Sequence, residues 1–180
     1  MSNKLQVMVD LETLGQNSFA VPLSIGAVKF DPMGDLDAEM ETFHVYVDPA
    51  SAVAHGLSMD TSTVMWWLAQ SPEAQRMQTE AKRLSLPESL TAFSEWFGKE
   101  SLPVWGNGST FDNVILSNAF KACGMEQPWR FWDDRCYRTV KNLAPEVKIE
   151  RMGTHHNALH DAMSQAHHLQ LVFQKLFPKP

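Results

Sequence analysis

The chain has few cysteines, no long apolar run and no excess of basic residues. Its 2 cysteines, Cys123 and Cys136, form no close-spaced motif, which suits the reducing cytosol and leaves each as a core thiol. No apolar run approaches the roughly 18 residues of a membrane span, and the N-terminal residues lack the apolar region of a signal peptide. We therefore expect a cytoplasmic protein without a membrane partner.

Positive charge is scarce overall but unevenly placed. The net charge of -6 at pH 7 argues against a broad basic surface for nucleic acid. However, six of the 15 basic residues fall in one stretch ahead of the predicted C-terminal helix. Two interpretations stay open, a local phosphate-facing patch and a solvated face. The six residues are Arg130, Arg135, Arg138, Lys141, Lys148 and Arg151.

The composition is that of a soluble globular protein, with a hydrophobic content of 44% and a charged content of 20%. The length suffices for one domain, residues 1–180, with a full core. Three strands are predicted first, at residues 5–10, 22–30 and 40–47, and their short links favour an antiparallel meander. Helices and strands then alternate, so we expect an α/β fold with a mixed sheet.

Helix signals follow the three strands. Asp60-Thr61 can cap a helix through residues 64–68, and Ser85-Leu86-Pro87-Glu88 is a capping box. The polar residues 78–84 are expected to be exposed. The other predicted elements are a buried strand at 102–105, a helix capped by Ser109 or Thr110, an extended segment at 131–132 and a long helix at 157–177.

Two carboxylates, Asp10 and Glu12, end the first strand. Side chains of a strand alternate between its faces, so these two point the same way. Unpaired carboxylates that lie side by side repel each other. A divalent cation with oxygen ligands, Mg²⁺ or Mn²⁺, would offset this repulsion, so the strand end is a candidate cation site.

Two further acids lie where a cation site would need them. Asp112 lies in the first turn of a predicted helix that follows a buried strand, and Asp161 lies early in the last helix among small and apolar neighbours. Each also has a simpler explanation. The helix dipole favours an acid in the first turn, and Asp161 can be a solvated helix residue.

His156 precedes Asp161 by five residues, which corresponds to about 140° of helix rotation, so the two would not share a helix face. The useful geometry places His156 in the loop before the helix, with Asn157 as the cap. A loop histidine beside a metal carboxylate can act as a general base near neutral pH. His155 and His160 compete for this role. His156 and His160 also have a zinc-ligand spacing, although the carboxylates favour harder ions.

Taken together, these residues resemble a known family. Asp10-x-Glu12-Thr13, a mid-chain Asp112 and His156-x₄-Asp161 resemble the three motifs of the DEDDh 3′–5′ exonucleases, over nearly the whole chain. The resemblance implies a ribonuclease H-like fold, with a mixed five-stranded sheet flanked by helices.

Two further runs support the resemblance. Residues 24–28 are similar to the family's second strand, and residues 64–74 resemble a subgroup of small phage and bacterial exonucleases of the DexA type. The chain departs from the family pattern at Asn107, where many relatives have histidine, and at His160, where acids are common.

The resemblance implies a metal-dependent enzyme with two divalent cations, Mg²⁺ or Mn²⁺. Asp10 would bridge both cations, Glu12 and Asp161 would complete the inner one, and Asp112 would hold the outer one. His156 would take a proton from the attacking water. The product would be a nucleoside 5′-monophosphate, released from the free 3′ end of single-stranded DNA or RNA.

Substrate contacts are implied by analogy. The main chain at Thr13 and the side chain of Leu14 would hold the terminal sugar and base. Aromatic residues would stack on bases, although a core position is an alternative for the tryptophans and for Phe111. The resemblance also allows a homodimer through apolar residues near 129–132. The stacking candidates are Phe19, Trp66, Trp67 and Phe111.

Two other functions stay open. One is a non-catalytic nucleic-acid-binding domain of the same fold, although all five motif positions are filled. The other is a metal-dependent endonuclease that uses the same carboxylates. No residue is an evident reader of a 2′-hydroxyl group, so the sequence leaves the choice between RNA and DNA open.

Overall fold

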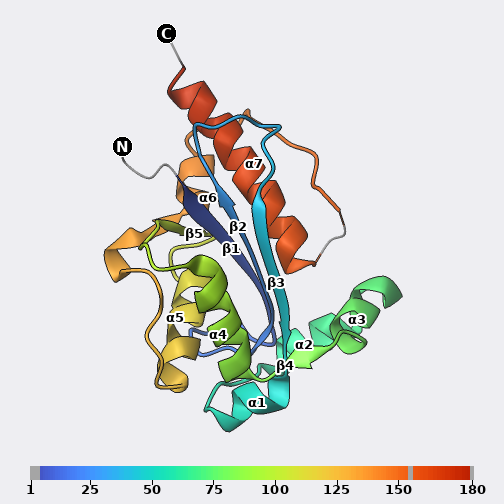
Figure 1. Cartoon of the computed structure of the whole chain (residues 1–180). Helices are drawn as coiled ribbons and strands as arrows, with labels where there is room; N and C mark the ends of the chain where they lie inside the picture. The colour runs from blue at the N-terminus through green and yellow to red at the C-terminus, as the bar shows by residue number, and fades with distance from the viewer. Residues whose placement is uncertain (1–4, 154–155, 179–180) are drawn as a thin grey trace.

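The computed structural model describes residues 5–153 and 156–178, which form a central β-sheet with helices on both faces (Figure 1). The strands are β1 (Gln6–Thr13), β2 (Pro22–Phe30), β3 (Glu41–Val47), β4 (Arg83–Leu84), β5 (Val104–Gly106) and β6 (Asp134–Cys136). The helices of these residues are α1 (Pro49–Ala54), α2 (Thr61–Leu68), α3 (Pro72–Thr79), α4 (Leu86–Phe97), α5 (Asp112–Ala122), α6 (Tyr137–Lys141) and α7 (Ala158–Leu176), with a 3₁₀ turn at Phe131–Asp133.

The strand order across the sheet is β4-β3-β2-β1-β5-β6. The predicted meander is confirmed, because β2 pairs antiparallel with both β1 and β3. Strand β5 then pairs parallel with β1, so the sheet is mixed, and β1 lies in its interior. None of the helices in the described residues is long and apolar enough to cross a membrane.

Alternation along β1 divides the core in two. Val7 and Val9 pack with residues of α4 and α5 on one face, whereas Met8 packs with residues of α7 on the other. Asp10 and Glu12 continue the Met8 series, so the strand directs them toward the α7 face. In Figure 1, α7 covers this face, together with the short α6, while α4 and α5 cover the opposite face.

Two glycines allow the helices that carry acids to approach the sheet. A Cβ on Gly26 of β2 would lie 2.2 Å from the backbone carbonyl carbon of Ala158, at the start of α7. A Cβ on Gly106 of β5 would lie 2.4 Å from Asn113 Oδ1 and 3.0 Å from the Cβ of Asp112, at the start of α5. Glycine at these two positions therefore sets how closely Asp112 and Asp161 approach β1.

Several predicted elements need correction. The sheet has six strands in the described residues, not five, because residues 83–84 pair with β3. The stretch 78–84 is not simply exposed, since Gln78 is buried. Residues 131–132 form a 3₁₀ turn, and the strand follows it.

The start of α5 is also corrected. Neither Ser109 nor Thr110 caps the helix, whose N-cap is Phe111 without a side-chain cap bond. The physical reason lies in Asp112, whose carboxylate accepts the Asn107 N–H and so closes the preceding loop in place of a hydroxyl cap.

Candidate active site

Three carboxylates meet at the end of β1. The ligand atoms of Asp10, Glu12 and Asp161 all lie within 4.8 Å of one another. Asp10 and Glu12 come from one face of the strand, and Asp161 comes from the first turn of α7. Asn157 fixes that turn, because its side chain accepts the His160 N–H at 3.1 Å as the predicted N-cap.

Asp112, a fourth acid, lies against β1 beside Asp10 and is buried. Its Oδ1 accepts the Leu11 N–H at 3.1 Å, and its Oδ2 accepts the Asn107 N–H at 2.7 Å. The side chain is thus hydrogen-bonded to β1 and to the residue that follows β5. Its position therefore has a further cause besides the dipole of its own helix, which favours an acid in the first turn. Both oxygens keep further lone pairs for a ligand.

The site holds its acids at a high electrostatic cost. Burial, followed by the charge of Asp161, raises the pKa of Glu12 from 4.5 to about 8. Burial raises the pKa of Asp112 to about 6. The pKa of Asp10 is also raised well above its usual value, by burial and then by Asp112 and Glu12. A divalent cation would relieve this repulsion, and the all-oxygen donor set fits Mg²⁺ or Mn²⁺.

Two polar residues at the site contact its acids: Gln165, which was missed from the sequence, and Arg151, which was noted only as part of the basic stretch. The Gln165 side-chain amide donates to Asp10 Oδ1 at 2.7 Å, and Arg151 forms an ion pair with Asp161 at 3.4 Å. Gln165 follows Asp161 by four residues, and this helical spacing could have identified it as a neighbour on the same face. The basic stretch marks Arg151, but no local pattern pairs it with Asp161, because Arg151 lies in an irregular segment.

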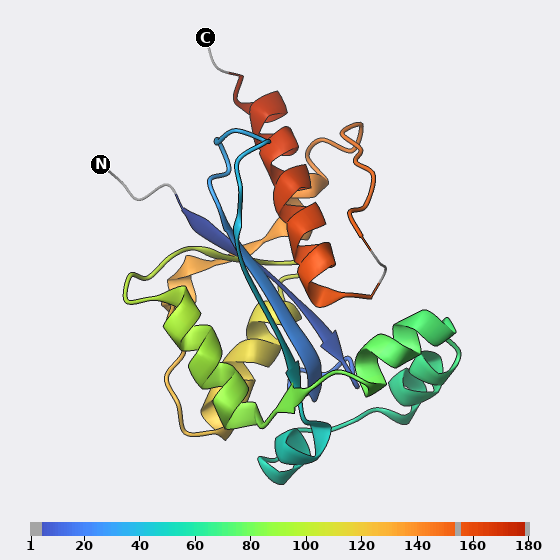
Figure 2. The same cartoon turned by 45° about the vertical axis from the view of Figure 1, so that its right-hand side comes forward.

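His156 lies before the N-cap of α7, as the spacing predicted, with a left-handed backbone at φ 60°. Its ring meets the ring of Trp66 edge-on, with centroids 4.9 Å apart. Figure 2 shows α2, which carries Trp66, beside the N-terminal end of α7. The ring of His160 lies instead against Gly153, whose added Cβ would come within 2.3 Å of it.

The structure bears on the other two predicted histidine roles, His155 as the base and a zinc pair of His156 and His160, to different extents. His155 lies outside the described residues. The zinc pair of His156 and His160 does not form on one helix face, because α7 begins at Ala158. The metal-ligand cluster found in the described residues contains carboxylates alone.

A cavity of about 420 Å³ opens beside Glu12. Four of the six predicted substrate-binding residues line it, whereas half-buried Leu14 packs on the core and Phe19 is 51% exposed. Trp67 is buried and donates its indole N–H to the Thr13 carbonyl at 2.9 Å, while Trp66 is 43% exposed. The four lining residues are Thr13, Trp66, Trp67 and Phe111.

Residues 129–132 divide into core and surface. Trp129 is buried, whereas Phe131 and Trp132 are 75% and 58% exposed. The homodimer expected through this region stays a prediction.

A mixed sheet with this strand order, carrying acids of β1, α5 and α7 to one point, defines a ribonuclease H-like nuclease of the DEDDh type. The family model described as the 3′–5′ exoribonuclease Rv2179c-like domain matches residues 5–173. The chain therefore belongs to this family of 3′–5′ exonucleases.

One protein is similar to this chain in sequence, and two solved structures are similar to it in fold. An exodeoxyribonuclease of Enterobacteria phage T4 is 25% identical in an alignment of 160 positions, and the match covers 73% of this chain and 68% of the phage protein. Exonuclease I of E. coli, solved with a dT13 oligonucleotide, has a TM-score of 0.65 at 16% identity over 97% of this chain. The match covers only 43% of the Exonuclease I chain. The nuclease domain of 3′hExo, a DEDDh family member solved with rAMP, has a TM-score of 0.63 at 12% identity, over 97% of this chain and 94% of that domain.

Proposed function

We propose that the chain is a single metal-dependent exonuclease domain that releases nucleoside 5′-monophosphates from the 3′ end of single-stranded DNA or RNA. The observation that carries the proposal is the carboxylate cluster of Asp10, Glu12 and Asp161, within 4.8 Å, beside a cavity with aromatic walls. The cluster suits a phosphodiester, and the cavity suits a terminal nucleoside.

The cavity would bind the terminal nucleoside. Trp66 and Phe111 would offer ring surfaces to the base. Trp67 has a different part, because its indole N–H is already bonded to the Thr13 carbonyl. It would hold the main chain of Thr13 against the terminal sugar. Leu14 and Phe19 line no part of this cavity, so they would act at its rim.

The acids would hold two divalent cations, Mg²⁺ or Mn²⁺, which when bound supply charge stabilisation for the attacking and leaving oxygens. Asp10 is central among them, because the acids of β1, α5 and α7 all raise its pKa. Both oxygens of Asp112 already accept backbone N–H groups, which suits an outer ligand that acts through water.

His156 would act as the general base. An imidazole nitrogen would take a proton from the attacking water, and the water oxygen would form a bond to phosphorus. The bond between phosphorus and the 3′ oxygen of the preceding nucleotide would break, so the phosphate leaves on the 5′ carbon of the released nucleoside.

The test is a cleavage assay with Mn²⁺ or Mg²⁺ and 5′-labelled single-stranded oligonucleotides of matched RNA and DNA sequence. A ladder that shortens from the 3′ end is expected. Internal cuts would indicate an endonuclease, and binding without cleavage would indicate a non-catalytic domain. The two sugars are compared because the family description names an exoribonuclease and the T4 relative is an exodeoxyribonuclease.

Asp10→Ala is expected to abolish cleavage and leave the fold intact. The matched control is Asp37→Ala, since Asp37 is an exposed acid in the loop between β2 and β3. Full activity of Asp10→Ala would contradict the assignment of the metal ligands.

A further inference from the structure

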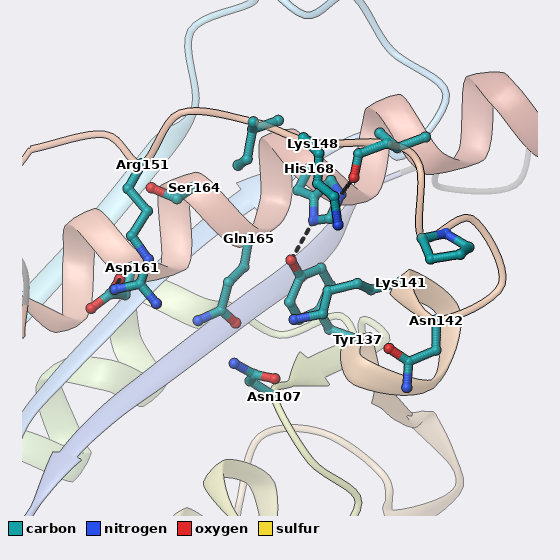
Figure 3. Close-up of a pocket in the computed structure, with 13 residues that line it drawn as sticks. Asn107, Tyr137, Lys141, Asn142, Lys148, Arg151, Asp161, Ser164, Gln165 and His168 are labelled. Carbon is teal, nitrogen blue, oxygen red and sulfur yellow. Dashed lines mark hydrogen bonds and ion pairs between the residues drawn. The ribbon is translucent and has the colours of Figure 1, made fainter.

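A second cavity, of about 280 Å³, adjoins the carboxylate site at Asp161 (Figure 3). Its walls come from α6, from the irregular segment 142–151 and from α7. Asp161 and Gln165 belong to its lining, so the cavity adjoins the carboxylate site. In Figure 3 the side chain of Asn107 faces Gln165 from the sheet below.

The charge of this cavity is opposite to that of the carboxylate site. Lys141, Lys148 and Arg151 line it, and Asp161 is the acid among its lining residues. Arg151 is paired with Asp161, whereas neither lysine forms an ion pair within residues 5–153 and 156–178. Lys141 Nζ also lies 5.4 Å from the centroid of the Tyr137 ring, in a cation–π contact. Both lysines thus line a cavity that adjoins Asp161, on a protein with a net charge of -6.

Two hydrogen bonds tie together the segments that carry the two lysines. Tyr137 Oη lies 2.6 Å from His168 Nδ1, and His168 Nε2 lies 2.9 Å from the Val147 carbonyl oxygen. A carbonyl can only accept, so Nε2 carries the proton and Nδ1 accepts from Tyr137. The two bonds tie α6, which ends at Lys141, and the segment at Lys148 to α7. These bonds thus fix the backbone beside both lysines, although the side chain of Lys148 is exposed.

The cavity also has an unused polar group. Gln165 is 9% exposed, and its Oε1 is buried without a hydrogen-bond partner in the described residues, while its amide nitrogen donates to Asp10. A buried polar atom without a partner is uncommon in a folded protein, and because an amide oxygen only accepts hydrogen bonds, it points to a bound water or another donor beside the cavity and not to a direct contact with phosphate oxygens.

The two cavities differ in the chemistry they offer. The cavity beside Glu12 has aromatic walls, and the cavity beside Asp161 has cationic and polar walls. A strand end whose last phosphodiester lies over the carboxylates has a nucleoside on one side and the next phosphate on the other.

We propose that the cationic cavity binds the phosphate on the 5′ side of the penultimate nucleotide, with Lys141 and Lys148 as its charge partners. The proposal rests on the proposed function, because it takes the carboxylates as the place of the scissile bond. The enzyme would then recognise the phosphate that lies one nucleotide upstream of the scissile bond.

Dinucleotides separate this phosphate from the scissile one. An unphosphorylated dinucleotide, NpN, has the scissile phosphodiester alone, whereas pNpN also has a phosphate that can enter the cationic cavity. We expect kcat/KM to be about 10-fold or more higher for pNpN than for NpN, as a charge-assisted contact would give. Lys141→Gln and Lys148→Gln should each reduce this ratio, and the double variant should bring it close to one.

Lys175→Gln is the matched control, since Lys175 is exposed in the last turn of α7 and away from the cavity. It should keep the wild-type ratio. Equal rates on NpN and pNpN in the wild-type chain would overturn the proposal, as would a ratio that the double variant leaves unchanged.

Binding provides a readout that does not need turnover. In the Asp10→Asn chain, titration calorimetry should show that pNpN binds more tightly than NpN, and that the two lysine substitutions remove the difference. If the wild-type chain cleaves no oligonucleotide but this difference persists, the proposed function fails and the phosphate site stands. If cleavage occurs without the difference, the phosphate site fails and the function stands.

Discussion

Asp10 is surrounded by acids and bonded to one amide. Burial and the charges of Asp112, Glu12 and Asp161 all raise its pKa, and the hydrogen bond from Gln165 lowers it. A hydrophobic residue at this position would avoid these electrostatic costs. Bound cations would offset the repulsion among these acids, and the hydrogen bond from Gln165 would then orient Asp10 toward the cations.

A single substitution can test the proposed role of His156 as the general base. We expect His156→Asn to lower kcat about 100-fold or more, because the general base is lost. Asparagine tolerates the left-handed backbone at φ 60° better than alanine does, so the loop should keep its shape. The measurement is the rate of release of the first nucleotide from a single-stranded oligonucleotide.

His160→Asn is the control for this experiment. Its ring lies against Gly153, and its substitution should leave most of the activity. If His160→Asn gives the larger loss, the wrong histidine has been assigned as the base.

At the scale of elements, the close approach of α7 to β2 is what places Asp161. A methyl group at Gly26 would collide with backbone atoms of Ala158 and Leu159, which cannot move as a side chain can. We expect Gly26→Ala to destabilise the protein by about 2 kcal/mol or more and to lower the cleavage rate, since α7 must shift away from Asp10. Thermal unfolding and the cleavage assay measure the two effects.

Gly34→Ala provides the comparison. Its added Cβ would meet Asp31 within the same turn, far along the chain from the acids, so a smaller loss of stability and an unchanged rate are expected. A Gly26→Ala chain with wild-type stability and rate would show that the helix position is not set by this contact.

The elements that the sequence predicted correctly have local signals. Strand β2 was predicted at its observed bounds, and the capping box of α4 and the Asn157 cap of α7 were also found. Strand β4 was missed because its two residues adopt strand structure only by pairing with β3, which is distant in the sequence. The same holds for the site. Spacing identified the acids, but the cationic cavity depends on how α6 and the segment 142–151 pack on α7.

On the scale of the whole molecule, two chemically different cavities adjoin one group of acids. Three segments distant in sequence bring acids to the end of β1, where an aromatic cavity adjoins Glu12 and a cationic cavity adjoins Asp161. The net charge of -6 is therefore a poor guide to where a phosphate backbone would bind, because the local distribution of charge determines the binding position.

The same acids link the stability of the whole protein to pH and to cations. The pKa of Glu12 rises from 4.5 in an unfolded chain to about 8 in the folded one, so between these values the folded chain holds a proton that the unfolded chain has released. The metal-free protein should therefore be most stable below pH 4.5 with respect to this group, and should lose about 2 kcal/mol or more as the pH rises through 8.

Cations should reverse this loss, because they bind the ionised carboxylates and compete with protons. We expect millimolar Mn²⁺ or Mg²⁺ to raise the Tm by more at pH 8 than at pH 6, when thermal unfolding is compared with a chelator-treated sample. Asp10→Asn should raise the Tm of the metal-free protein at pH 8, since it removes one repelling charge, and should abolish most of the cation effect. Equal cation effects at both pH values, or an undiminished effect in Asp10→Asn, would show that the cations bind elsewhere on the molecule.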